Sequence, residues 1–276
     1  MEDLVGKWSE EKLELLKKYL MGYVAVLRNQ VSKGIKGYEY IDGFAGTGKP
    51  KSKDKERYVD GSPRVALGLP TPFTKYHFIE ISDWRRERLQ SLRQEFPDRN
   101  IEVYPGDCNE VLRSRIVPTL PYSSYKRAIA FLDPFGLALE WDTLKAIAGA
   151  RTIEVFINIP IMDINRNIRR QDRDQISEES RRRITLFWGP GWDADFFEEA
   201  PPDLFGQTQI VLKQQSAKQV GNLYRKRLQE LFKFCTVPVV LRNSINAPLY
   251  CLIFAGHKEA GLNIAESIFD KYDKMG

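Results

Sequence analysis

Acidic residues follow three successive β-rich segments of the sequence, each at the point where the segment ends. They are Asp42, Glu80 and Asp107, after the predicted strands 38–42, 76–81 and 101–104. Because ligands of open parallel sheets bind outside the carboxyl ends of the strands, we expect these carboxylates to share one edge. A carboxylate there can accept hydrogen bonds from the hydroxyls of a ribose, which predicts a nucleoside-binding edge with Glu80 on the ribose. Taken singly, each residue is equally well explained as a helix cap or a solvated acid.

A glycine-rich turn follows the first of these strands, with the sequence Tyr40-Ile-Asp-Gly-Phe-Ala-Gly-Thr-Gly48. Glycines in such a turn let the backbone approach a ligand closely. The turn resembles the D-x-F-x-G-x-G motif of class I methyltransferases. This resemblance implies that Asp42, Phe44, Gly46 and Gly48 bind S-adenosylmethionine, while Asp107 takes the place of the acid that meets the adenine amino group.

Residues 43–49 also match the beginning of a P-loop, G-x-x-x-x-G-K, and Asp133 resembles a Walker B acid. Pro50, however, stands where a P-loop needs Ser or Thr to hold Mg²⁺. The lysine-rich segment 49–60 is typical of a loop and not of the helix that should follow. Asp42 would also place negative charge beside a triphosphate. These features favour the methyltransferase interpretation over an NTPase.

The predicted strand 128–132 ends in the sequence Asp133-Pro-Phe-Gly136. This resembles motif IV of methyltransferases that modify exocyclic amines, including tRNA guanine-N2 methyltransferases. Such an amine is a poor nucleophile, because its lone pair is delocalised into the ring. The Asp133 carboxylate and the Pro134 carbonyl can accept both amine hydrogens and so localise that lone pair. Phe135 can stack on the base and align the nitrogen with the methyl donor. The alternative is an Asp-Pro turn that only ends the strand.

A basic segment follows the fifth predicted strand and contains Arg166, Arg169, Arg170 and Arg173. Clustered arginines at the ligand-binding edge of a sheet favour contacts with phosphates. A solvated helix, partly neutralised by nearby acidic residues, explains the pattern equally well. The chain carries 42 Lys and Arg against 37 Asp and Glu, a net charge of +5, which permits a nucleic-acid partner without establishing one.

Strands alternate with helices along the chain, which predicts an α/β fold with a Rossmann-like, doubly wound and mostly parallel sheet. Further strands are predicted at 153–159, 237–241 and 249–254, and helices at 8–31, 83–96, 142–150, 214–234 and 259–272. The last two strands form a predicted antiparallel hairpin. Another helix is predicted to begin with Ser62 as N-cap and Pro63 at the first helical position. We expect one domain over 1–276, with an N-terminal helical extension (1–36) and a partly helical, arginine-rich insertion (160–210).

The number of cysteines and the hydropathy of the chain indicate the cellular compartment in which the protein is expected. Cys108, Cys235 and Cys251 are odd in number and lack metal-type spacing, and only two histidines accompany them. We therefore expect free thiols in a reducing compartment and no metal site. No segment reaches the ~20 apolar residues of a membrane span, and no secretory signal is recognised at the start. A cytoplasmic protein without a membrane partner is the expectation.

Nearly the whole chain resembles the three-Cys-motif partner (TcmP) family. The likeness includes the helix Lys12–Leu20, Tyr40–Gly46, Gly61-Ser-Pro63, Phe78-Ile-Glu80, Asp133-Pro-Phe-Gly136, the basic segment, Phe187-Trp-Gly189 with Trp192, and Pro248-Leu-Tyr250. This resemblance implies a class I methyltransferase fold and association with a three-Cys-motif protein, but little about the substrate. Thr47 departs from the family, where proline is common.

These observations predict an S-adenosylmethionine-dependent methyltransferase that acts on an exocyclic amino group of a base in RNA or DNA. The alternative is a non-catalytic Rossmann-like module that binds nucleic acid or protein together with its three-Cys-motif partner. The intact Asp133-Pro-Phe motif favours the enzyme.

Overall fold

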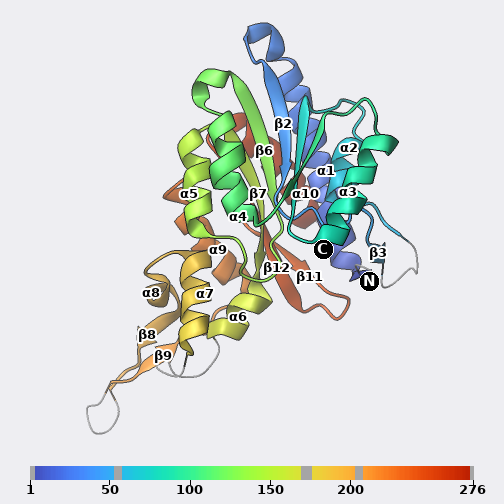
Figure 1. Cartoon of the computed structure of the whole chain (residues 1–276). Helices are drawn as coiled ribbons and strands as arrows, with labels where there is room; N and C mark the ends of the chain where they lie inside the picture. Colours follow the sequence, from blue (N-terminus) through green and yellow to red (C-terminus); the bar gives the residue numbers. More distant parts are fainter. Residues whose placement is uncertain (1–3, 53–57, 169–175, 203–207, 274–276) are drawn as a thin grey trace.

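A central sheet of eight strands organises the molecule, as seen in a computed structural model that describes residues 4–52, 58–168, 176–202 and 208–273. The strand order is β10-β12-β7-β6-β2-β4-β5, with β11 also paired to β12 (Figure 1). The strands are β2 (Gly37–Asp42), β4 (Lys75–Glu80), β5 (Ile101–Pro105), β6 (Lys126–Leu132), β7 (Ile153–Pro160), β10 (Phe234–Cys235), β11 (Val239–Arg242) and β12 (Pro248–Gly256). Strands β2, β4, β5, β6 and β7 are parallel, and β12 runs antiparallel to its neighbours.

Helices cover both faces of this sheet and create two separate apolar cores. One face carries α1 (Lys7–Arg28), α2 (Ser62–Leu67), α3 (Asp83–Glu95) and α10 (Glu259–Asp273). The other carries α4 (Cys108–Val111), α5 (Trp141–Ala150) and α9 (Ala217–Gln229). Because both faces are covered, β2 and β7 are buried along their whole length. Successive residues therefore serve opposite cores, as Tyr40 and Ile41 do.

The segment after β7 extends past the carboxyl end of the sheet (Figure 1). It contains α6 (Ile161–Ile168), α7 (Glu178–Trp188), α8 (Trp192–Phe196), β8 (Phe197–Glu199) and β9 (Ile210–Leu212). Trp188 anchors it, because its ring packs edge-on against Tyr224 of α9 at 4.9 Å between centroids. Shorter pieces are β1 (Leu4–Val5), β3 (Lys51–Ser52), and 3₁₀ or π turns at Val31–Lys33, Leu112–Ile116, Val117–Thr119 and Tyr122–Ser124. No helix within the described ranges is long and apolar enough to cross a membrane.

The predicted fold class is confirmed, but three local predictions are wrong. The helix predicted over 214–234 ends at Gln229, because its last residues instead form β10 against β12. The helix predicted to run to residue 31 ends at Arg28. The N-cap of α2 is Gly61, and Ser62 lies inside the helix. There the Ser62 side chain hydrogen-bonds to Asp42, while the Gly61 N–H donates to the Gly48 carbonyl at 2.9 Å.

Close packing beneath the glycine turn makes Gly43 sensitive to substitution. A Cβ at this position would lie 2.8 Å from both Cys108 Sγ and Leu132 Cδ2, and both neighbours are buried. We expect Gly43→Ala to lower the free energy of unfolding by ~1–3 kcal/mol, measured by urea denaturation. Gly149→Ala in α5 is the control, since no atom lies within 4 Å of its Cβ position; it should gain up to ~1 kcal/mol. Equal stability changes in the two variants would contradict this packing.

Candidate active site

The glycine turn after β2 is tied to the two strands beside it. The Gly43 N–H donates to the Phe131 carbonyl of β6 at 3.0 Å, and the Ala45 N–H donates to the Ile79 carbonyl of β4 at 3.1 Å. Gly46 and Gly48 have φ values of +62° and +71°, in the left-handed region that glycine occupies without strain. The turn is therefore fixed at the carboxyl edge of the sheet, with Gly43 and Gly48 buried and Gly46 partly exposed.

Glu80 fixes the same turn from the end of β4. Its Oε2 accepts the Gly46 N–H at 2.9 Å, and its Oε1 accepts the Ser82 N–H at 2.8 Å. Arg85 Nη1 lies 4.0 Å from Oε1. Only 5% of Glu80 is exposed, although each carboxylate oxygen has a second lone pair. Glu80 thus has a structural task in addition to the ribose contact that the sequence predicts.

Asp42 lies beneath the turn and has no exposed surface. Its carboxyl group accepts hydrogen bonds from Tyr40 Oη at 3.1 Å and from the Phe44 N–H at 3.4 Å, and Ser62 also bonds to it. Burial raises the pKa of Asp42 to about 7, and the bonds from Ser62 and Tyr40 oppose that rise. Asp42 therefore supports the turn from within, while Phe44 is half-exposed above it.

Asp107 is the exposed acid that follows β5. It caps α4, because Oδ1 accepts the N–H groups of Asn109 at 2.9 Å and Glu110 at 3.1 Å. The preceding Gly106 has a φ of +122°, which turns the chain over the edge of the sheet. The capping role and a ligand contact are compatible, since capping uses only Oδ1.

Asp133 is held from two directions at the end of β6. Its Oδ1 accepts a hydrogen bond from Asn158 Nδ2 of β7 at 2.6 Å, and its Oδ2 forms an ion pair with Lys12 Nζ of α1. The Asp133 side chain is 27% exposed, whereas Lys12 is 2% exposed. Asn158 Oδ1 is buried and has no hydrogen-bond partner among the residues that the structure describes. A hydrogen-bond acceptor with a fixed orientation therefore lies at the sheet edge.

Aromatic rings surround the buried ammonium group of Lys12. Nζ lies 4.7 Å from the ring centroid of Trp8 and 5.8 Å from that of Phe131. The Trp8 ring in turn stacks on Tyr250 of β12, with centroids 4.6 Å apart and an interplanar angle of 26°. Elements α1, β6, β7 and β12 therefore meet at Asp133.

Phe135 projects from this cluster with 96% of its surface exposed, whereas Pro134 is buried. Gly136 follows with a φ of +61°, so the chain turns sharply after the aromatic residue. A largely exposed aromatic ring beside a fixed carboxylate is available to stack on a planar ligand.

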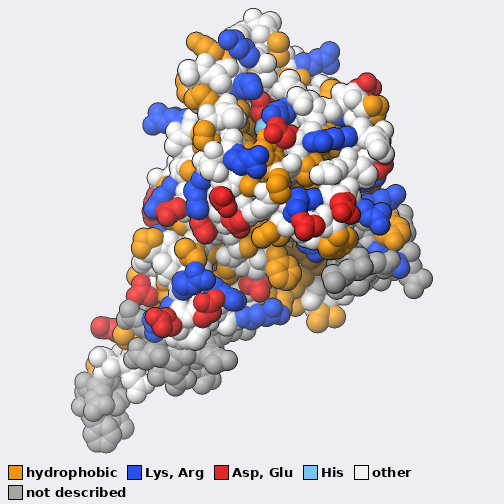
Figure 2. Space-filling view, in the orientation of Figure 1, with side chains coloured by type: hydrophobic (Ala, Val, Ile, Leu, Met, Phe, Trp, Pro, Cys, Tyr) orange, Lys and Arg blue, Asp and Glu red, His pale blue; other side chains and the backbone are white. Residues whose placement is uncertain are grey.

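The structure describes only one of the four predicted phosphate-binding arginines. Arg166 on α6 is exposed and pairs with Asp163 at 3.4 Å, while Arg169, Arg170 and Arg173 lie outside the described residues. Figure 2 shows basic side chains interspersed with acidic ones over the face in view, without a large field of one sign. Arg166 is thus partly neutralised locally.

Neither of two other kinds of site finds support. After Lys49 the chain continues as a loop and β3, so the helix that a P-loop requires is absent there. Within the described ranges, no three His, Cys, Asp or Glu side chains are grouped so that they could hold a metal ion. Cys108, Cys235 and Cys251 are free and buried.

The sequence analysis did not identify Lys12 and Asn158 as site residues, although the sequence around each contains an indication of its role. Trp8, Lys12 and Leu16 are spaced four residues apart, so Lys12 falls on the apolar face of α1. A lysine on such a face requires a buried partner. Asn158 is likewise a polar residue within the continuous apolar run of β7. Neither signal identifies the partner without the fold.

Comparisons with known proteins show a loose structural likeness only. No family model matches the sequence, and no curated protein matches it. A Legionella pneumophila protein is 14% identical with a TM-score of 0.47, over 94% of this chain and 92% of its own. An rRNA methylase from Streptococcus thermophilus is 13% identical (TM-score 0.37; 80% and 88% covered). The N-terminal domain of EvdMO1, solved with S-adenosylhomocysteine and D-fucose, is 9% identical (TM-score 0.40; 85% and 82% covered). At these values the likeness transfers no activity.

Asp42 makes a testable contribution to stability. Because its pKa is about 7 in the folded protein and 3.8 ordinarily, the folded state retains a proton between these values that the unfolded state loses. Stability should therefore fall as pH rises from 4 to 7, by up to about 4 kcal/mol from this group. Asp42→Asn should remove that part of the fall in urea unfolding curves measured across this range. A slope identical to that of the wild type would show that Asp42 is not the buried acid responsible.

Proposed function

We propose that this protein is an S-adenosylmethionine-dependent methyltransferase that modifies an exocyclic amino group of a nucleic-acid base. The observation that carries the proposal is the fixed Asp133 carboxylate, oriented by Lys12 and Asn158, beside the exposed ring of Phe135. This group lies at the same sheet edge as the glycine turn, because β6 is hydrogen-bonded to β2 along its length.

The residues at the turn fit the proposed cofactor. Gly46 is partly exposed and has no side chain, Glu80 and Asp107 each retain an unused acceptor lone pair, and Asp42 supports the turn from below. S-adenosylmethionine would supply an electrophilic methyl group on its sulfonium. Glu80 would then bind the ribose hydroxyls and Asp107 the adenine amino group.

Asp133 would act on the attacking amine. Its carboxylate accepts one N–H of the amine and so concentrates the lone pair on nitrogen. As the C–N bond forms and the S–C bond breaks, the nitrogen becomes positively charged, and the adjacent carboxylate stabilises that charge in the transition state. The nitrogen would then release one proton to water, and the demethylated cofactor would leave as a neutral thioether. Lys12 compensates the charge of Asp133 before the substrate arrives, and Asn158 holds the plane of the carboxylate.

Phe135 would position the base. Stacking of a base on an aromatic side chain contributes about 1–3 kcal/mol, and it tolerates any base because every base has a flat face. The basic segment with Arg166, Arg169, Arg170 and Arg173 would bind the phosphates of the polymer. A three-Cys-motif protein is a proposed partner on the family resemblance alone.

Glu80 provides the test of cofactor binding. Glu80→Ala also releases the turn, so Glu80→Gln is the better variant, because glutamine keeps one acceptor oxygen. We expect Glu80→Gln to weaken S-adenosylmethionine binding about tenfold or more in isothermal titration, since charge-assisted hydrogen bonds to the ribose are lost. Glu87→Gln on the exposed side of α3 is the matched control and should bind as the wild type does. No binding by the wild type would favour the non-catalytic alternative.

Asp133 provides the test of catalysis. Asp133→Ala should lower the single-turnover rate of methyl transfer by orders of magnitude with cofactor affinity nearly unchanged, and Asp133→Asn should retain some activity through its acceptor oxygen. The substrate is first found by uptake of labelled methyl into mixed cellular RNA and DNA.

Stability must be measured beside this rate, because Asp133→Ala leaves the buried Lys12 ammonium without its partner. The double variant Lys12→Met, Asp133→Ala removes that penalty and should recover stability without recovering activity. If the double variant regains the wild-type rate together with its stability, Asp133 is only structural.

A further inference from the structure

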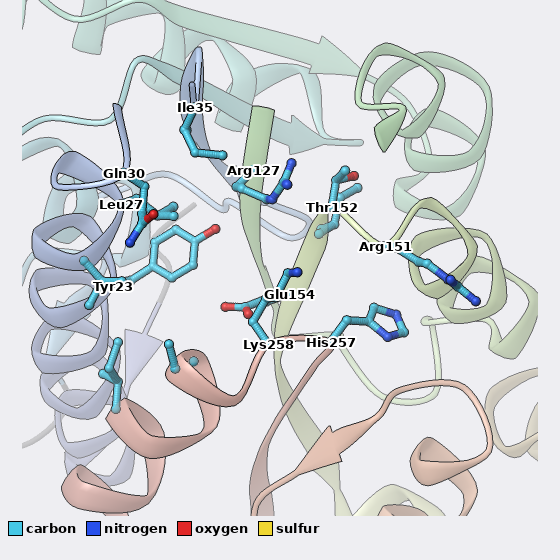
Figure 3. A pocket seen from close by; sticks show the side chains of 15 residues that line it. Tyr23, Leu27, Gln30, Ile35, Arg127, Arg151, Thr152, Glu154, His257 and Lys258 are labelled. Carbon is cyan, nitrogen blue, oxygen red and sulfur yellow. The ribbon is translucent and has the colours of Figure 1, made fainter. Parts of the chain in front are cut away.

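A cavity of about 300 Å³ lies at the sheet edge opposite the candidate active site. It opens where β6 and β7 begin, between α1 and the first turn of α10 (Figure 3). Asp133 and the glycine turn lie at the other ends of the same parallel strands. The two places therefore share no residue.

A buried acid forms the inner wall of this cavity. Glu154 of β7 is 8% exposed, and its Oε2 accepts a hydrogen bond from Tyr19 Oη at 3.0 Å. The structure gives Oε1 no donor among the described residues. A Cβ on Gly261 would lie 2.6 Å from Oε2, so glycine at this position of α10 provides the space that the Glu154 carboxyl group occupies. Burial raises the pKa of Glu154 to about 7, and Tyr19 and Lys258 oppose the rise.

The side walls are apolar and come from elements on both sides of Glu154. Leu27 and the ring of Tyr23 project from α1, and Ile264 from α10, while Ile35 and Ile153 close the remaining sides. Figure 3 shows Tyr23 reaching into the cavity from α1 and Glu154 from β7. The walls thus form an apolar compartment that ends in a hydrogen-bond acceptor.

Three cationic side chains, Arg127, Arg151 and Lys258, also line the cavity. None of them forms an ion pair with a carboxylate in the described part of the chain. The Arg127 guanidinium lies over the Tyr122 ring at 5.0 Å. Burial lowers the pKa of His257, so this side chain adds no cation near neutral pH, although its Nε2, 3.0 Å from the Ala148 carbonyl, opposes the shift.

This polarity selects a ligand with two unlike ends. The Glu154 carboxyl group requires a hydrogen-bond donor, whereas the three cationic side chains attract an anion. A volume at the lower end of the range for ligand pockets suits a single small molecule and not a polymer. A nucleotide whose base carries an amino group meets this requirement. It has a hydrogen-bond donor at one end, a flat ring in the middle and an anionic phosphate at the other end.

We propose that this cavity binds a purine nucleotide, with its base against Glu154 and its phosphate at Arg127, Arg151 and Lys258. Guanine fits best, because its ring N–H and its amino group can both donate to one carboxylate. Adenine offers only its amino group there, and hypoxanthine only its ring N–H. Binding at this cavity is independent of the proposed methyl transfer.

The experiment is isothermal titration of the wild-type chain with GMP, IMP, AMP, guanosine and inorganic phosphate. We expect GMP to bind more tightly than IMP or AMP, and also more tightly than guanosine, which lacks the phosphate. Glu154→Gln should weaken GMP binding about tenfold or more. The double variant Arg151→Ala, Lys258→Ala should reduce GMP to the affinity of guanosine, and it remains a test if Glu154→Gln fails to fold.

Two controls locate the site. Lys226→Ala, an exposed change on α9, should leave GMP binding unchanged. Saturating S-adenosylmethionine should also leave it unchanged, because the two sites lie at opposite edges of the sheet. The proposal is overturned if no nucleotide binds at millimolar concentration, if phosphate alone binds as well as GMP, if GMP affinity survives in both cavity variants, or if S-adenosylmethionine displaces GMP.

Discussion

The ion pair between Lys12 and Asp133 is the interaction on which the geometry of the candidate site depends. It joins α1, which precedes the sheet in the chain, to the carboxyl end of β6. A buried ammonium group costs several kcal/mol to desolvate and persists only when an opposite charge compensates it. Because Lys12 is also enclosed by the rings of Trp8 and Phe131, it cannot leave Asp133 without exposing apolar surface. The position of α1 and the orientation of one carboxylate are thus set together.

Acidic side chains also hold the glycine turn in place. Glu80 holds the turn through the Gly46 N–H, and Asp42 holds it from beneath through the Phe44 N–H. Both residues stabilise a backbone shape whose glycines would be exposed to a ligand. In such an arrangement a ligand contact and a structural bond use different lone pairs of one carboxylate. A substitution at Glu80 therefore changes the shape of the turn as well as its chemistry, which is why a variant that retains an acceptor is more informative than alanine.

Most of the fold could be predicted from local sequence patterns. Continuous apolar runs such as 128–132 identify the central strands, because parallel strands are buried on both faces. Prediction failed where distant parts of the chain decide the outcome. Phe234 leaves its predicted helix since β12 offers it a strand partner, and Gly61 becomes the N-cap because Ser62 bonds to Asp42. Within the site, residue types indicated Asp133 and Phe135, but the pairing of Lys12 with Asp133 spans 121 positions of sequence and depends on the assembled sheet.

The parallel sheet also explains why its two edges differ in chemistry. At the carboxyl edge, strands pass into turns that acidic side chains hold, as Glu80 holds the Gly46 N–H and Asp107 caps α4. At the amino edge, strands are entered from helices and loops, and here the entry positions carry Arg127 and Arg151, with Lys258 beside them. Glu154 lies one residue inside β7, on the face covered by α1 and α10, so its carboxyl group is enclosed by helices and not by solvent. A cavity lined by a buried acid and by cationic side chains favours a ligand that has a hydrogen-bond donor at one end and an anionic group at the other. Such a ligand would bind to helices α1 and α10 together.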